Sequence, residues 1–212
     1  MKKLLFVVSA LAAISLLAPS SGFAQWENRI GVYTETDALG TAEAQMDLEP
    51  STLAYVYFVL TVPRNNGVPV TNIEGFECTV NVEPLATFFK LGETYNSTNG
   101  AQALNVSSYP EYVVGWTLPV PVIGDQIMLM RWNVMLNAAD AYYVYLTMAS
   151  NPSIPGALVY QDADGTSGSV ERPLLVGAMP SSGAFDVPSF AFNDVTIPEK
   201  QESFGTVKAL FR

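Results

Sequence analysis

Short apolar segments with an alternating pattern constrain the fold of this chain more than any other feature. The clearest one spans Phe76 to Glu83, where apolar and polar residues alternate strictly. A period of two predicts a strand whose apolar residues face the core and whose polar residues face solvent. The inward set is Phe76, Cys78, Val80 and Val82, and the outward set is Glu77, Thr79, Asn81 and Glu83.

Several other segments are predicted to be strands. Leu53–Val62 is almost continuously apolar and rich in β-branched and aromatic residues, so we expect both of its faces to be covered. Gln126–Leu136 is expected to direct Met128, Met130, Trp132, Val134 and Leu136 to one side. Further candidate strands are Arg29–Thr34, Ala86–Leu91, Tyr112–Thr117, Tyr142–Met148, Ala157–Gln161, Ser169–Gly177 and Phe190–Ile197.

Turn residues separate these segments, as in Asn65-Asn66-Gly67 and Asp164-Gly165, and no long segment has helical periodicity. About nine short strands with such punctuation predict an all-β fold, namely an antiparallel β-sandwich or a jelly-roll-like barrel.

The first residues are predicted to form a secretory signal peptide. Lys2 and Lys3 precede an apolar run from Leu4 to Leu17, and Gly22-Phe23-Ala24 offers a cleavage site after Ala24. The run is shorter than the ~20 residues that a membrane-spanning helix needs. We therefore expect a leader at 1–24, a single sandwich domain at 25–198 and a secreted product, extracellular or periplasmic, with no membrane attachment after cleavage.

The last residues, 199–212, differ from the rest and are treated as a C-terminal tail. A polar stretch is followed by Phe204, Val207, Leu210 and Phe211 at helical spacing. Two interpretations stay open: a short element that docks on the sandwich, or a segment recognised by a partner or by the export machinery.

Charge and composition exclude several functions. The net charge of −10 disfavours nucleic acids and anionic lipids as partners. The absence of histidine excludes Ser-His and Cys-His nucleophile pairs and histidine-containing zinc sites. Cys78 is the only cysteine, so no intramolecular disulfide can form, and we expect an inert buried thiol. No phosphate-binding glycine loop occurs, and we expect no cofactor.

The segment Asn72–Pro84 resembles the early strand region of cohesin-type domains. In that family a valine- or isoleucine-Xaa-Gly-Phe step, here Ile73-Glu74-Gly75-Phe76, leads into an alternating strand that ends near an acidic-proline turn. Leu53–Val62 and Phe88–Gly92 occur in the order that the family suggests. The chain has Val82-Glu83-Pro84 where the family usually has Tyr-Asp-Pro. The resemblance implies a cohesin-like or carbohydrate-binding-module-like sandwich in a secreted bacterial protein, and it transfers no dockerin-binding residues.

The nearest sequence to a metal motif is Asp162-Ala163-Asp164-Gly165-Thr166. Alternate aspartates can supply oxygen ligands to calcium, but the glycine and glutamate that an EF-hand loop requires are missing. The alternative, which we favour, is a hairpin turn.

Aromatic side chains are candidates for sugar binding. Tyr143 and Tyr145 are predicted on one face of a strand, where exposed rings could stack on a glycan; packing in the core is the other interpretation. Trp116 and Trp132 are predicted to lie in the core.

These features predict a secreted, non-catalytic binding or structural module with an extracellular glycan or protein partner. The alternative is a secreted carboxylate-dependent hydrolase such as a glycosidase, which requires two carboxyl groups roughly 5–10 Å apart.

Overall fold

The computed structural model describes residues 26–164 and 174–194. The predicted leader, the tail at 199–212 and the predicted strand residues 169–173 and 195–197 lie outside the described residues. In the part that is described, no helix is long and apolar enough to cross a membrane.

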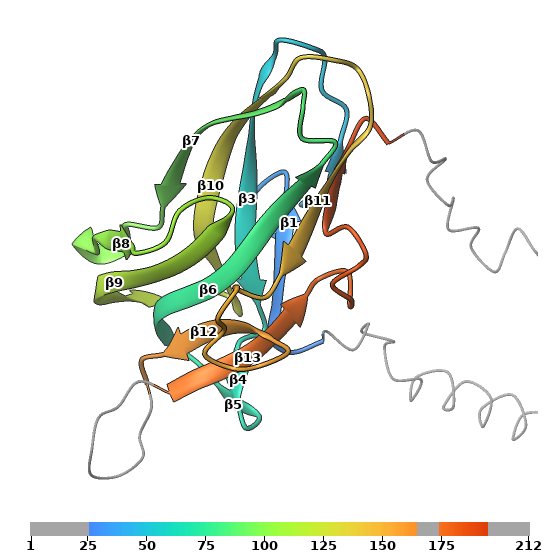
Figure 1. The fold of residues 1–212 in the computed structure, drawn as a ribbon. Coiled ribbons are helices and arrows are strands. Elements are labelled where there is room, and N and C mark those ends of the chain that lie inside the picture. Colours follow the sequence, from blue (N-terminus) through green and yellow to red (C-terminus); the bar gives the residue numbers. More distant parts are fainter. Residues whose placement is uncertain (1–25, 165–173, 195–212) are drawn as a thin grey trace, which may run out of the picture.

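Two layers of strands form an antiparallel β-sandwich, as predicted (Figure 1). The first, called the β3 layer, has the order β1-β3-β10-β7. The second, called the β6 layer, is centred on β6, with β9 and β8 along one edge of it and β11, β12, β14 and β2 on the other side. The bounds of the β3 layer are β1 Arg29–Tyr33, β3 Leu53–Thr61, β10 Gln126–Leu136 and β7 Phe88–Tyr95. Those of the β6 layer are β2 Gln45–Met46, β6 Asn72–Glu83, β8 Ala103–Asn105, β9 Glu111–Pro121, β11 Tyr142–Thr147, β12 Leu158–Asp162 and β14 Phe190–Phe192.

One strand connects the two layers. β13 (Leu174–Pro180) pairs antiparallel with β12 through its first five residues and parallel with β1 at Met179 and Pro180. β11 and β12 pair with successive halves of the same edge of β6, so residues 148–157 between them must loop out of the sheet.

The alternation in β6 was predicted correctly. Phe76, Cys78, Val80 and Val82 are buried, and Glu77, Thr79, Asn81 and Glu83 lie on the outer face. The buried sides of both layers enclose one hydrophobic core that includes Val56, Phe58, Ile73 and Trp132.

The prediction for Leu53–Val62 was partly wrong. Its second half is buried on both faces, but Leu53 and Tyr55 are 58% and 46% exposed on the outside of the β3 layer. Apolar composition alone does not distinguish a covered face from an exposed one, because folded proteins keep much apolar surface in contact with water.

The prediction for β10 was wrong at Met128. The pairing with β3 shifts between Met128 and Met130, which marks a β-bulge at Leu129. An extra residue in a strand reverses the alternation. Leu129 and Met130 are therefore both fully buried, and Met128 is half-buried on the outer face.

The short pairings β2–β14, β8–β9 and the hairpin of β4 (Arg64–Asn65) with β5 (Val68–Pro69) were not predicted as strands. The turn at Asn65-Asn66-Gly67 does connect β4 to β5, with Asn66 and Gly67 at φ 51° and 79°.

Candidate functional site

One row of side chains crosses the outer face of the β6 layer. Cross-strand pairing aligns Leu104 with Gly115, Gly115 with Gly75, Gly75 with Gln161 and Gln161 with Leu175. Gly115 and Gly75, the second and third of these five positions, have no side chain, and the terminal leucines are 66% and 48% exposed. The row therefore has an apolar wall at each end and two glycines as its floor, with the Gln161 side chain leaning over Gly75, its Oε1 atom 3.3 Å from where a Cβ atom would lie.

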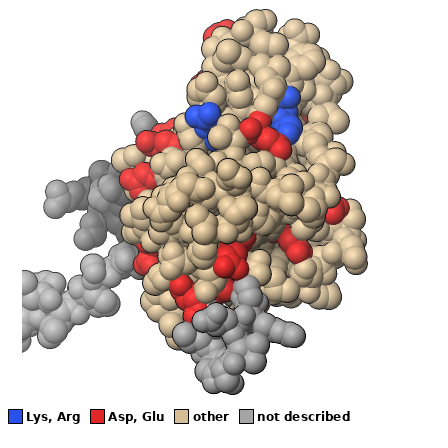
Figure 2. Space-filling view, turned by 90° about the vertical axis from the view of Figure 1, so that its left-hand side faces the viewer, with Lys and Arg blue, Asp and Glu red and all other residues tan. Residues whose placement is uncertain are grey.

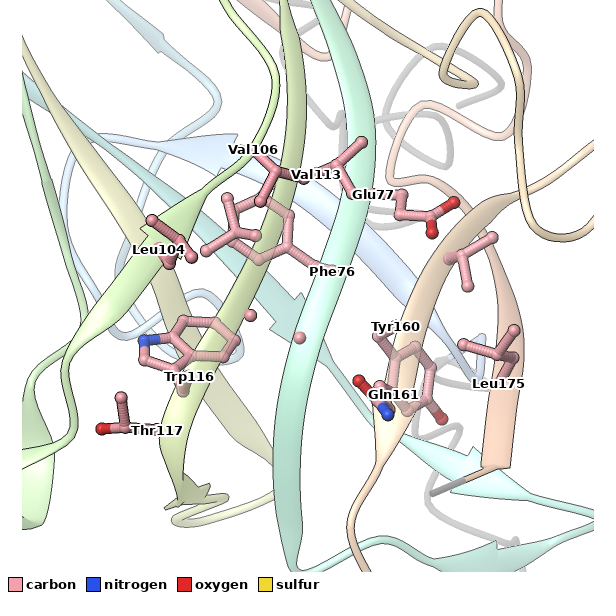
Figure 3. A pocket seen from close by; sticks show the side chains of 14 residues that line it. Phe76, Glu77, Leu104, Val106, Val113, Trp116, Thr117, Tyr160, Gln161 and Leu175 are labelled. Atoms are coloured by element: carbon pink, nitrogen blue, oxygen red, sulfur yellow. The ribbon is translucent and has the colours of Figure 1, made fainter. Parts of the chain in front are cut away.

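The row forms an open hollow of about 410 Å³, called here the glycine hollow. Figure 3 shows Leu104 and Val106 on one side of β6 and Gln161 and Leu175 on the other. Val106 is 72% exposed. Figure 2 shows that the side of the molecule bearing β8 and β9 has a broad uncharged area, with Asp and Glu side chains around it.

The two glycines of the floor serve different purposes. A Cβ atom at Gly75 would lie 2.6 Å from the Val114 carbonyl oxygen, so the fold requires glycine there. A Cβ atom at Gly115 would meet nothing closer than the Glu74 carbonyl oxygen at 4.0 Å. Packing does not require glycine at this position, and a side chain there would only occupy the hollow.

The loop at 148–157, called here the strap, is hydrogen-bonded to Glu77, which lines the hollow, and to Glu111 at the start of β9. Ser153 donates hydrogen bonds through its N–H (3.0 Å) and hydroxyl (2.5 Å) to the Glu77 carboxylate, and Ser150 donates both of its groups to Glu111. These bonds from Ser150 lower the pKa of Glu111. Val159 pairs with Glu77 on the outer face and is nonetheless 1% exposed, which the overlying strap explains.

Tyr143 and Tyr145 lie on the same face of β11, as predicted; that face is the outer one, and both side chains are half-buried. They pair with Glu83 and Asn81 of β6, outside the residues that line the glycine hollow. Val144 between them is fully buried. Sugar binding by the two tyrosines stays a prediction.

The predicted core aromatics are buried. Trp132 is fully buried, and Trp116 is 8% exposed with its Nε1–H donating to the Asn96 carbonyl oxygen at 2.8 Å. Cys78 is a free, buried thiol, and burial raises its pKa. Low thiolate content at neutral pH agrees with the inert role predicted for it.

The aspartates of the predicted turn clamp β12 to the start of β6. Asp164 accepts hydrogen bonds from the N–H and hydroxyl of Thr71 and from the N–H (3.0 Å) and side-chain amide (2.9 Å) of Asn72. Asp162 is 3% exposed and accepts bonds from the Asp164 N–H and the Asn65 side chain, each at 2.8 Å. Protein donors thus engage both carboxylates, which favours the structural interpretation over calcium binding.

β12 and β13 pair as a hairpin, although Gly165 of the predicted turn lies outside the described residues. Within the described ranges, no group of three or more Cys, Asp or Glu side chains is arranged to hold a metal ion.

The Asp164 clamp should make stability depend on acid pH. Burial alone would raise the pKa of Asp164, but the hydrogen bonds from Asn72 and Thr71 hold it below the ordinary value. This stabilisation is present above the unfolded-state pKa of about 3.9 and is lost as pH falls through the lower folded-state value. We expect Asp164→Asn to cost about 1 kcal/mol near neutral pH and to lose part of the acid dependence. Urea unfolding between about pH 6 and pH 3 measures this, and parallel pH profiles for both proteins would contradict it.

The glycine hollow offers little support for hydrolysis. Glu77 is the one carboxylate among the described residues that line it, and Ser153 donates hydrogen bonds to both of the Glu77 carboxylate oxygens. A glycosidase needs a second carboxyl group facing the first.

Sequence reasoning missed the residues that build this site. Gly75 and Gly115 are isolated glycines within strand patterns, and such glycines often mark a bulge or a close approach of another molecule to the backbone. That signal was available, but the alignment of the two glycines depends on the β6–β9 register, which shifts between Ile73 and Gly75.

Comparisons with known proteins found similar solved structures only. No protein-family model matches the chain, and no curated protein matches it. The sixth cohesin of scaffoldin B from Acetivibrio cellulolyticus, solved in complex with a Cel5 dockerin, is 12% identical with a TM-score of 0.46, and the alignment covers 79% of this chain and 99% of that one. The seventh ScaB type I cohesin from Pseudobacteroides cellulosolvens is 9% identical with a TM-score of 0.44, covering 65% and 84%. A cohesin module from a family 33 glycoside hydrolase of Clostridium perfringens is 10% identical with a TM-score of 0.37, covering 72% and 98%. All are cohesin modules, the family that the segment Asn72–Pro84 resembles.

Proposed function

We propose that this chain is an exported, non-catalytic protein-binding module whose glycine hollow accepts an apolar side chain of the partner. The observation that carries the proposal is the cross-strand row with an exposed leucine at each end and the glycine pair Gly115 and Gly75 between them. Export rests on Lys2, Lys3 and the apolar run Leu4–Leu17.

The energetics favour an apolar contact in this hollow. Burying a leucine side chain from water contributes about 1.5–3 kcal/mol, and Leu104 and Leu175 are both substantially exposed. The centre of a protein interface is poor in charged residues and tightly packed. Of the described residues that line the hollow, Glu77 alone is charged.

A protein side chain fits this hollow better than a sugar does. Sugar rings stack on flat exposed aromatic faces, whereas the exposed walls here are aliphatic, and the aromatic rings that line the hollow, such as Trp116, are buried. Gly115 is exposed, and the absence of a side chain there lets an extended segment of a partner approach the backbone closely.

The test fills the hollow without disturbing the fold. In Gly115→Leu the new side chain enters open space, and the strand gains a residue with a side chain that can pack. Peptides selected on the wild-type chain from a random-peptide phage library should share an apolar anchor, and we expect their affinity to fall about tenfold or more in Gly115→Leu. Fluorescence anisotropy with synthetic peptides measures the loss.

The matched control is Gly92→Leu on β7 of the opposite layer. A Cβ atom at Gly92 meets nothing within 4 Å, and one at Gly115 meets nothing closer than 4.0 Å, so both variants add the same side chain to open surface at different places. The proposal fails if no peptide is selected, or if both variants weaken binding by the same factor.

A further inference from the structure

A second hollow, unrelated to the first, lies on the outer face of the β3 layer. Cross-strand pairing aligns Tyr33 with Tyr57, Tyr57 with Arg131 and Arg131 with Thr94 across β1, β3, β10 and β7. An open hollow of about 320 Å³ lies over this row, and Arg131, Tyr57 and Thr94 line it. We call it the arginine hollow.

The β-bulge in β10 helps to shape this hollow. Because Leu129 turns into the core, the side chain of Met128 lies on the outer face and lines the hollow next to the segment after β7. That segment supplies Ser97 and Thr98, and Asn96 fixes it by donating to the Met128 carbonyl oxygen at 2.8 Å and accepting from the Thr98 N–H at 2.9 Å. The walls are therefore held in place by hydrogen bonds before any ligand binds.

Arg131 is held in position but has no acidic partner in the described part of the chain. Its guanidinium carbon lies 4.5 Å from the centre of the Tyr55 ring, a cation–π contact that restricts the plane of the group. Arg64 and Lys90, in contrast, form ion pairs with Asp125 and Glu93 at 2.9 and 2.5 Å. Among the described residues no Asp or Glu lines the arginine hollow, so the positive charge of Arg131 is available to a ligand.

The donors around Arg131 define the ligand chemistry. A guanidinium group in a fixed plane binds a carboxylate through two parallel hydrogen bonds. Hydroxyl groups on Tyr57, Thr94 and Ser97 can donate and accept, which matches a ligand rich in hydroxyl groups. Among the described lining residues Met128 is the only aliphatic side chain, and the two lining tyrosines, Tyr57 and Tyr95, each carry a hydroxyl group on their ring.

From this arrangement we propose that the arginine hollow binds a uronic-acid residue of a glycan, with the sugar carboxylate on Arg131 and the sugar hydroxyls on Tyr57, Thr94 and Ser97. The site is independent of the glycine hollow and lies on the opposite layer from Tyr143 and Tyr145. A module with both sites would hold an acidic polysaccharide on one face and a protein on the other.

Isothermal titration calorimetry of the full chain tests the site. The probes are trimers of galacturonate, mannuronate and guluronate, together with their carboxyl-reduced neutral counterparts. We expect at least one acidic trimer to bind about tenfold or more tightly than its neutral counterpart, with an affinity that falls as salt concentration rises. Arg131→Gln should remove this preference, Arg131→Lys should restore part of it, and Tyr57→Phe should weaken binding by about threefold.

Two controls locate the binding. Tyr143→Ala/Tyr145→Ala and Gly115→Leu alter the other layer and should leave the affinity unchanged. N-acetyl-trialanine presents a carboxylate without sugar hydroxyls and should bind about tenfold more weakly than the acidic trimer. The proposal is overturned if no acidic trimer binds, if the neutral trimer or the peptide binds equally well, if Arg131→Gln retains the preference, or if the tyrosine double variant abolishes it.

Discussion

Replacing Val80 with aspartate is expected to lower the free energy of unfolding by roughly 4 kcal/mol or more, because the new carboxylate would be buried without a partner. The Val80 side chain is fully buried, and its strand pairs with Leu146 of β11, which is also fully buried. Urea unfolding followed by far-UV circular dichroism measures the loss, and the variant is expected to be unfolded or close to unfolding at room temperature.

The adjacent position supplies the control for this prediction. Asn81 points to the outer face of the same strand, where its amide makes one long hydrogen bond of 3.4 Å to the Thr147 hydroxyl. Asn81→Asp introduces the same carboxylate into a partly solvated place and should cost less than about 1 kcal/mol. Equal losses in the two variants would mean that the register of β6 is wrong.

The register of β6 could be read from the sequence because its two faces differ in chemistry. One face meets the core, and the other meets water or the serine hydrogen bonds of the strap, so apolar and polar residues alternate. The same reasoning failed in β10, where Met128, Leu129 and Met130 are all apolar. A bulge changes which residues face the core without changing the composition, so three apolar residues in succession give no sign of it.

The glycine hollow could not be assembled from the sequence for a different reason. Gly75, Gly115 and Leu175 are far apart in the chain, and they become neighbours only through the exact pairing of β6, β9, β12 and β13. Its wall residue Leu104 belongs to β8, which has only three residues and no recognisable strand pattern. Isolated glycines indicated where to look, but not that two of them would pair.

The arginine hollow illustrates the same limit. Arg131 lies on the outer face of β10, and nothing in the sequence indicates that Tyr55 stacks on it or that it lacks an acidic partner among the described residues. Pairwise distances between side chains decide whether a cation is neutralised within the fold or available to a ligand. The positions of the few basic residues are therefore more informative than the net charge of −10.

One end of the core is closed by a cluster of aromatic and charged groups around Lys90. Its ammonium nitrogen lies 5.1 Å from the ring centre of Tyr109 and 5.6 Å from those of Tyr112 and Trp132. Glu93 accepts hydrogen bonds from Lys90 and from the hydroxyls of Tyr95 and Tyr112. Burial opposes the ionisation of Glu93, but these bonds hold its pKa below the ordinary value. The aromatic rings and the ion pair therefore support each other.

Trp132 is the centre of this arrangement, and its removal should be the most damaging truncation in the core. Its ring contacts Phe58, Phe88 and Tyr112 at centre distances of 4.9, 6.4 and 6.2 Å, so it joins β10 to β3, β7 and β9 across the two layers. Trp132→Ala leaves a large cavity and is expected to cost about 3–5 kcal/mol. Trp132→Phe keeps an aromatic ring in place and should cost about 1–2 kcal/mol. Urea unfolding followed by circular dichroism measures the free energy of unfolding of both variants. Because the ring contacts both layers, we expect the whole sandwich to unfold in a single transition whose midpoint differs between the two variants. Similar midpoints for the two variants would contradict this prediction, because they would mean that the core closes around alanine as well as it does around phenylalanine.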